Sequence, residues 1–243
     1  MKCGGKDELD KPGTTRLVDS VRETFRARRA QTFRRYFAVG PQTKILDLGS
    51  SDGSHIAGVL RGLDVQPANV YIADVRQEAV HGGHQRYGFT PVHLHEDGPL
   101  PFPDRFFDIV FCSSVLEHVT ISKSRLWECR SDRVFEKLAL EHQKAFADQI
   151  RRVGIGYFVQ TPYRYFPIET HTWLPFVGYM PRRAQMAVIR AANRVWIKRT
   201  QPDWYLLSRR DMVQLFPEVL IVPERVALLT KSLIAVKTAG GMP

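Results

Sequence analysis

Cysteine is scarce in this sequence, and long apolar runs are missing. The 243 residues include three cysteines, an odd number too small for the disulfide framework of a secreted domain, so we expect a reducing compartment. No uncharged apolar stretch approaches the roughly 18 residues that a membrane-spanning helix needs. The opening residues MKCGGKDELDKP have no apolar segment after their charges, which predicts no secretory signal. We therefore expect a cytoplasmic chain, with surface contact to a membrane left open.

Compositional bias is also absent, which excludes collagen-like, low-complexity and wholly disordered classes. Glycine (17) and proline (15) follow no period, and the hydrophobic share (44%) and charged share (25%) are those of a folded chain with a sizeable core. Charge is the exception, because 35 Lys and Arg against 25 Asp and Glu give a net charge of +10. A basic chain suits nucleic acid, an anionic membrane or an acidic substrate, and net charge alone does not choose among them.

Short apolar runs alternate with helical patterns along most of the chain. This alternation predicts an α/β fold, with a Rossmann-like, seven-stranded, mostly parallel sheet covered by helices on both faces. Strands are expected at 44–48, 70–74, 91–95, 107–112, 155–160, 219–223 and 233–237, with helices at 54–63, 76–84, 133–153 and 209–216.

Two further segments complete a single predicted domain, 15–243, behind a flexible tail at 1–14. A basic helix is expected at 15–37, with the Arg26-Ala27-Arg28-Arg29 cluster on a solvated face. Residues 163–202 predict an insertion over the cleft at the strand ends, first aromatic and proline-rich and then a basic helix at 182–199. A basic amphipathic helix beside aromatic residues is compatible with peripheral contact to an anionic membrane.

A loop of small residues follows the first predicted strand, in the sequence DLGSSDG at 47–53. Gly49 and Gly53 permit a positive φ or a close backbone approach, and Ser51 keeps the middle of the loop small. The free N–H groups of the following helix then face the crevice where ligands bind in open parallel sheets. Asp47 disfavours a pyrophosphate at this place and favours a cation or hydroxyl groups.

A second acid, Asp74, ends the next predicted strand. A carboxylate at that point can accept both hydroxyls of a ribose, as does the acid that follows a dinucleotide-binding loop by about 20 residues. An adenosyl ligand with a positively charged aminoacyl arm fits Asp47 and Asp74 together.

These residues resemble the class I S-adenosylmethionine-dependent methyltransferases, and more narrowly the small proteins with a type 11 methyltransferase domain. Ser51 stands where this family usually has a third glycine, which puts the loop geometry in doubt. The resemblance extends from about residue 44 to 172 and rests on four segments in order, DLGSSDG at 47–53, LPFPDRFFDIV at 100–110, SSVLEHV at 113–119 and TPYRYFPIETH at 161–171.

The resemblance implies S-adenosylmethionine as cofactor and assigns residues to its parts. The aminoacyl half would be held by Asp47, Gly49, Ser51 and Gly53. The ribose would meet Asp74, the adenine ring Val75, the adenine amino group Glu96 or Asp97, and the other side of the cofactor Ser113 and its neighbour Ser114.

The implied reaction is methyl transfer to an oxygen or nitrogen nucleophile of a small-molecule, sugar or lipid-linked acceptor. A general base is needed only if the acceptor is a hydroxyl or a protonated amine. His118 is the first candidate and His171 the second, since histidine titrates near neutral pH. Both have structural interpretations as well, His118 as a cap of the next helical turn and His171 as a hydrogen-bonded loop residue.

Other interpretations stay open from the residues alone. Gly49–Gly53 also satisfies the G-x-S-x-G pattern of α/β-hydrolases, with Ser51 as nucleophile, although no histidine follows His171. A dinucleotide-binding oxidoreductase usually has a G-x-G-x-x-G loop, and that pattern is absent from this sequence. A non-catalytic subunit that binds the cofactor is a further alternative, and nucleic-acid binding is disfavoured because no interleaved aromatic module is evident.

No metal site is predicted from the sequence. The spacing of four histidines suggests ligand pairs on a helix and on a strand, but no cysteine lies near them. These histidines are His81, His84, His93 and His95.

Overall fold

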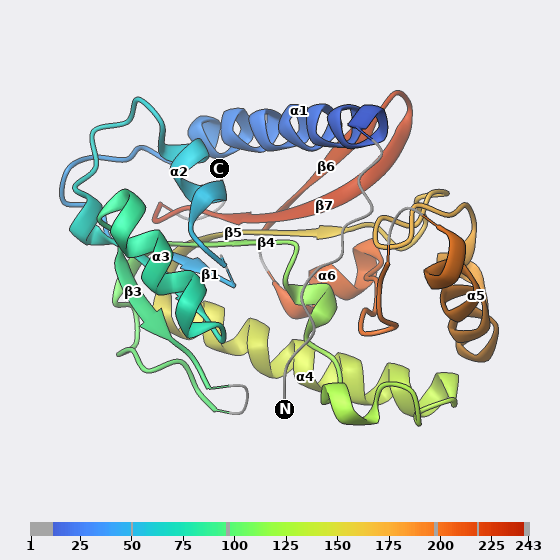
Figure 1. The fold of residues 1–243 in the computed structure, drawn as a ribbon. Coiled ribbons are helices and arrows are strands. Elements are labelled where there is room, and N and C mark those ends of the chain that lie inside the picture. Colours follow the sequence, from blue (N-terminus) through green and yellow to red (C-terminus); the bar gives the residue numbers. More distant parts are fainter. Residues whose placement is uncertain (1–11, 50, 96–97, 197–198, 218, 241–243) are drawn as a thin grey trace.

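The computed structural model describes residues 12–49, 51–95, 98–196, 199–217 and 219–240 (Figure 1). The helices are α1 (Pro12–Tyr36), α2 (Ser54–Leu60), α3 (Gln77–Tyr87), α4 (Asp132–Val153), α5 (Arg182–Val195) and α6 (Arg209–Leu215). The strands are β1 (Ile45–Leu48), β2 (Val70–Asp74), β3 (Thr90–His93), β4 (Phe107–Ser113), β5 (Gly154–Pro162), β6 (Leu220–Val226) and β7 (Leu229–Lys237). Two short 3₁₀ turns matter below, η2 (Leu116–His118) and η4 (Val177–Tyr179).

The strands form one seven-stranded sheet in the order β3-β2-β1-β4-β5-β7-β6. Strands β1 to β5 are parallel, whereas β7 runs antiparallel to both β5 and β6. The predicted α/β fold with a mostly parallel sheet is therefore confirmed. The strand order reverses at β1, which pairs with β2 on one side and with β4 on the other. Ligands of open α/β sheets bind at the carboxyl ends of the strands beside such a reversal.

Each face of the sheet has its own apolar core (Figure 1). On one face, α1, α2 and α3 cover the sheet, and Phe33 of α1 packs edge-on against Phe111 and Phe158 at ring distances of 5.8 Å. On the other face, α4 and α6 cover it, and Phe216 packs on Tyr157 at 5.3 Å. The two covered faces explain why the central strands read as continuous apolar runs rather than as alternating ones.

Residues 163–207, which we call the cap, connect β5 to the residues before α6 and contain η4 and α5. Ile189 of α5 packs in a separate small core with Val177, Trp204 and Leu206. The buried guanidinium of Arg182 donates to the carbonyl groups of three residues in neighbouring segments, Leu126, Cys129 and Pro202. The amphipathic pattern of α5 is therefore used for packing within the cap.

None of the helices in the described ranges is long and apolar enough to cross a membrane.

The predicted element ends need correction in several places. Helix α1 begins at Pro12, so the predicted tail at 1–14 is wrong for residues 12–14, and residues 1–11 lie outside the described ranges. Proline is favoured in the first turn because its missing N–H has no partner there in any case. Helix α3 continues to Tyr87 and ends at Gly88, whose φ of 71° is the left-handed conformation that helix ends favour.

The closing hairpin and α5 also differ from the predicted bounds. The turn lies at Ala227 and Leu228, because β6 extends to Val226 and pairs there with Leu229. Helix α5 ends at Val195, four residues before the predicted end.

Arg29 departs most clearly from the prediction of a solvated basic face. It is 9% exposed and forms a two-pronged ion pair with Glu224 of β6, Nε to Oε1 at 3.2 Å and Nη2 to Oε2 at 3.1 Å. Its Nη1 also donates to Ser113 Oγ at the end of β4, at 3.4 Å. Arg29 thus ties α1 to the sheet and to the strand end beside the crevice.

Replacing Arg29 with Met should destabilise the fold strongly, because the Glu224 carboxylate is left buried without its cation. We expect a loss of about 3–5 kcal/mol in the free energy of unfolding, measured by urea denaturation. The exposed Arg26→Met is the matched control and should stay within about 0.5 kcal/mol of the wild type. Equal stability of the two variants would contradict a structural role for the pair.

Candidate active site

The loop after β1 has the strained geometry that its small residues suggest. Gly49, Ser51 and Gly53 all adopt positive φ values, of 75°, 62° and 71°. A Cβ on Gly49 would lie 2.5 Å from a methyl group of Val115, so the loop backbone packs directly on the segment that follows β4. Ser51 adopts the conformation that glycine prefers, at a cost of about 1 kcal/mol. A serine at position 51 is therefore compatible with the glycine-type loop.

Asp74 lies at the end of β2 and holds this loop. Its side chain is nearly buried, Oδ2 accepts the Ser51 N–H at 2.8 Å, and Oδ1 accepts the Arg76 N–H at 2.9 Å. Arg76 also places its Nε 3.4 Å from Oδ1. A carboxylate has about four acceptor positions, so these bonds leave capacity for a hydroxyl group.

The other described residues predicted for the cofactor lie in β1 or at the ends of β2 and β4. Asp47 is 2% exposed in β1, and Val75 follows β2 with 41% of its surface exposed. Ser113 Oγ donates to Gln160 Oε1 at 2.8 Å. Glu96 and Asp97 lie outside the described residues.

A polar cluster fills the space beyond β4 and β5, on the cap side of the crevice. Glu117 in η2 is fully buried, and its Oε2 accepts the hydroxyl of Thr161 at 3.0 Å. His171 of the cap places Nε2 3.9 Å from Glu117 Oε1 and Nδ1 2.6 Å from Glu169 Oε1. The ring of His171 stacks on Trp204 at 5.3 Å.

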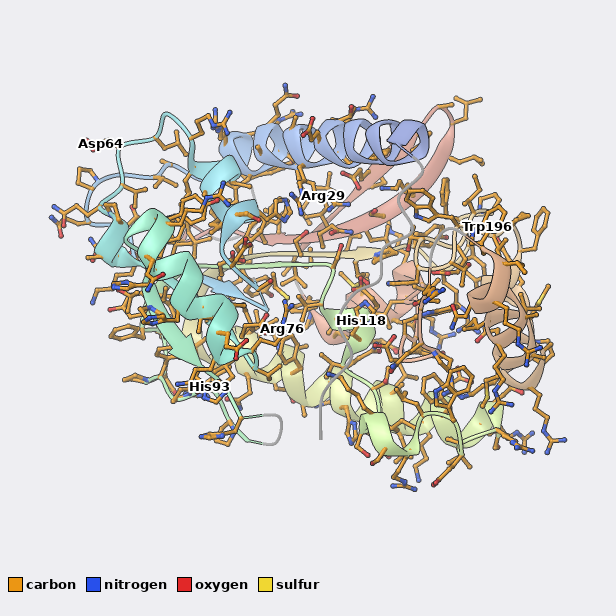
Figure 2. The ribbon with its side chains drawn as sticks, in the orientation of Figure 1. Arg29, Asp64, Arg76, His93, His118 and Trp196 are labelled. Carbon is orange, nitrogen blue, oxygen red and sulfur yellow. The ribbon has the colours of Figure 1, made fainter. Side chains whose placement is uncertain are left out.

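His118 completes this cluster. Its Nδ1 lies 3.3 Å from Asp203 Oδ1, and its ring meets the ring of His171 edge-on at 4.7 Å. The His118 side chain is 36% exposed, against 13% for His171. Figure 2 shows His118 in the middle of the molecule, between Arg76 and, on the cap side, Trp196. The structure thus brings the two predicted catalytic histidines together, and the more accessible of them is His118.

The charges of this cluster are set by their mutual contacts. Burial by itself lowers the pKa of His171, but the interactions with Glu117 and Glu169 outweigh it and raise that pKa to about 9. Burial raises the pKa of Glu117, yet His171 and His118 hold it below its usual value. The pKa of Asp203 is also lowered, because its contact with His118 outweighs the effect of burial. Near neutral pH, His171 is therefore a buried imidazolium held by two carboxylates.

The cluster and the loop belong to one site. Burial raises the pKa of the Cys112 thiol well above its usual value, and the charges of Glu117 and Asp47 add to that rise. Both acids therefore lie near enough to Cys112, at the end of β4, to act on the same thiol. Val115, which packs on Gly49, precedes Glu117 by two residues.

Comparison with known proteins agrees with this geometry. Residues 46–153 match the model of a methyltransferase domain family. The match runs from β1 to the end of α4. No curated protein matches the sequence.

Several solved structures resemble this chain at low sequence identity, and their resemblance shows the fold alone. A chain from the complex between the Haloferax volcanii Trm112 methyltransferase activator and a methyltransferase is 13% identical, with a TM-score of 0.53 over 97% of this chain and 99% of that one. A geranyl diphosphate methyltransferase in complex with SAM is 13% identical, with a TM-score of 0.51 over 95% and 92%. A SAM-dependent methyltransferase from Aquifex aeolicus is 14% identical, with a TM-score of 0.45 over 85% and 88%.

S-adenosylmethionine is the cofactor of the methyltransferase, and the residues at the ends of β1 and β2 suit it. The missing Cβ of Gly49 lets the loop backbone pack on Val115, and the buried Asp47 would supply negative charge for an aminoacyl ammonium and sulfonium. The exposed Val75 would offer an apolar surface to an adenine ring. The hydrolase interpretation fails, since no histidine among the described residues bonds the Ser51 hydroxyl. The oxidoreductase interpretation fails with it, because the domain family is that of methyltransferases.

Sequence inspection missed several members of the site. Glu117 stands next to His118 in the segment SSVLEHV, and this adjacency was a usable signal. Asp203 and Trp204 carry no local pattern and enter the site only because the cap folds back onto η2. Gln160, which joins Ser113 and Ser114, and the buried Arg29 have no local signal either.

Replacing Asp74 with Ala should weaken binding of S-adenosylhomocysteine at least about tenfold, because each hydrogen bond to a charged group contributes about 1.5–3 kcal/mol. Calorimetric titration measures the loss. Exposed Asp64→Ala serves as control and should bind like the wild type (Figure 2). Unchanged affinity of Asp74→Ala would remove Asp74 from the cofactor site.

Proposed function

We propose that the methyltransferase transfers the methyl group to an oxygen or nitrogen nucleophile of a small-molecule, sugar or lipid-linked acceptor bound between the loop after β1 and the cap. The observation that supports this proposal is the polar cluster around Glu117, His118 and His171. It lies beside the cofactor loop and holds an imidazole that is accessible and paired with a carboxylate.

The cofactor supplies an electrophilic methyl group on its sulfonium. The main task of the protein is then to hold the nucleophile in line with that methyl group, and such positioning contributes about 7–11 kcal/mol. In our proposal the residues that hold the acceptor come from η2 and from the cap.

We assign to His118 the removal of the proton from the acceptor. Its Nδ1 faces Asp203 at 3.3 Å, so the carboxylate orients the ring, while Nε2 is left for the acceptor. His171 has a different role in the proposal. As an imidazolium locked between Glu117 and Glu169, it cannot take a proton near neutral pH, and it supplies a fixed positive charge beside the acceptor.

The cap offers a cavity for the rest of the acceptor. This cavity has a volume of about 360 Å³ and is bordered by Trp204, the same ring that stacks on His171. Its lining combines aromatic and charged side chains, among them Glu136, Arg164, Tyr165 and Tyr205. Such a lining suits an acceptor with both polar and apolar parts.

An amphiphilic acceptor is also supported by the outer surface of the cap. Tyr165, Phe176 and Tyr179 are each about half exposed and lie ring to ring, at 6.3 Å and 6.2 Å. The exposed Arg183 and Arg194 of α5 add positive charge to the same segment. We therefore propose peripheral contact between the cap and an anionic membrane that carries the acceptor.

Methyl transfer should depend on His118. With labelled S-adenosylmethionine and a lysate extract as the acceptor source, His118→Gln should lower kcat about 10²–10⁴-fold, the usual contribution of a general base, and leave S-adenosylhomocysteine affinity unchanged. His81→Gln, an exposed histidine of α3, is the matched control. Equal turnover by His118→Gln and wild type contradicts the base role. Cofactor binding without label transfer by any variant would favour the non-catalytic alternative.

Membrane contact should depend on the arginines of α5. The wild type should sediment with anionic phospholipid vesicles and not with neutral ones. Arg183→Gln/Arg194→Gln should weaken this about tenfold or more, since each basic residue near an anionic surface contributes about 1 kcal/mol. The double variant Arg209→Gln/Arg210→Gln is the matched control, because it removes the same charge from α6, outside the cap. Sedimentation that ignores lipid charge would exclude the contact.

A further inference from the structure

Three side chains of the cluster have the arrangement of metal ligands. Glu117, His118 and His171 each offer one ligand atom, and these atoms all lie within 4.8 Å of one another. Two imidazoles and one carboxylate are a common donor set for divalent transition-metal ions, with positions left open for a substrate or water. The four histidines considered in the sequence analysis form no such three-ligand group in the described ranges.

The carboxylate of this group is incompletely bonded. Glu117 is fully buried, and its Oε2 accepts the Thr161 hydroxyl at 3.0 Å. Within the described residues, Oε1 has no hydrogen-bond partner, and the 3.9 Å to His171 Nε2 exceeds hydrogen-bond length. A buried carboxylate oxygen that accepts no hydrogen bond is costly, so the position of Oε1 near two imidazoles points to a bound cation.

Both imidazoles already have the outer partners that metal-bound histidines use. Glu169 holds Nδ1 of His171 and Asp203 holds Nδ1 of His118, which leaves Nε2 of each ring to bind a ligand. A carboxylate on the second ring nitrogen orients a ligating histidine and increases its basicity. The arrangement therefore extends beyond the three ligand atoms themselves.

The charge of the cluster also favours a cation. Glu117, Glu169 and Asp203 bring three carboxylates around His118 and His171, in a region where Glu117 and Glu169 are shielded from water. A divalent cation between Glu117 and the rings neutralises part of this charge. The partly exposed His118 side chain gives it a path from solvent.

We propose that Glu117, His118 and His171 bind one divalent transition-metal cation that also binds the oxygen of the acceptor. This inference rests on the proposed function and deepens it, because it favours an oxygen acceptor with one or more hydroxyl groups. With the cation bound, His118 and His171 act as neutral ligands, so His171 releases its proton to solvent and the cation takes the place of its positive charge. The cation then lowers the pKa of the acceptor hydroxyl in place of base catalysis. The proton then leaves to solvent.

Cobalt chloride is the probe that tests the site, because its visible absorption changes when histidines bind it. Metal-free protein, prepared with EDTA and desalted, should bind one Co²⁺ per chain with a saturable spectral change. His118→Gln and Glu117→Gln should bind at least about tenfold more weakly, since loss of even an outer partner costs 10- to 100-fold. His81→Gln should bind like the wild type, and magnesium chloride should compete poorly because imidazole suits transition metals.

Two outcomes overturn the site. One is the absence of saturable Co²⁺ binding to the wild type, and the other is equal binding by the wild type and His118→Gln. His118 is accessible, so its substitution keeps the test decisive even if Glu117→Gln does not fold. Measurements of methyl transfer and of S-adenosylhomocysteine binding in the presence of EDTA distinguish the metal site from the proposed methyl-transfer function. If both persist at full level while Co²⁺ does not bind, the metal inference fails and the proposed function stands.

Discussion

The parallel pairing of β1 with β4 is the constraint on which the site depends. It aligns Asp47 with Phe111, so the loop that leaves β1 and the segment that leaves β4 emerge side by side. Gly49 then packs on Val115 so closely that no side chain fits between them. Because of this contact, a cofactor loop and a polar cluster separated by more than 60 residues of sequence share one crevice.

Two long-range contacts place other segments against that pair of strands. Arg29 joins α1 to Glu224 at the far edge of the sheet and reaches Ser113 at the end of β4. On the opposite side, the cap brings His171 and Asp203 onto η2. The ion pair of Arg29 is buried, and its desolvation cost is compatible with a stable fold only because both prongs and the Ser113 contact are formed. The cluster under the cap has the same character, in that each charge is held by at least one opposite charge.

Interpretation of the site changes most at His171. As a residue in an aromatic loop, it is a plausible base or a plausible loop anchor. In the folded chain it is enclosed by Glu117, Glu169 and the ring of Trp204, which makes it a charged anchor. His118 differs because one side of its ring remains accessible. The functional difference between the two histidines is therefore one of burial and partners, and residue type does not reveal it.

Local sequence determined the alternation of strands and helices, the glycine-type loop at 47–53 and the positions of Asp47 and Asp74. These features depend on apolar periodicity and on backbone conformation, which neighbouring residues control. Local chemistry also sets the start of α6, where Ser208 Oγ accepts the Asp211 N–H. Only the tertiary structure decided that Arg29 is buried, and that Glu117 and Asp203 join the two histidines. Such contacts depend on how distant segments pack, and burial and electrostatic pairing acquire their energies only after the strands have been ordered in the sheet.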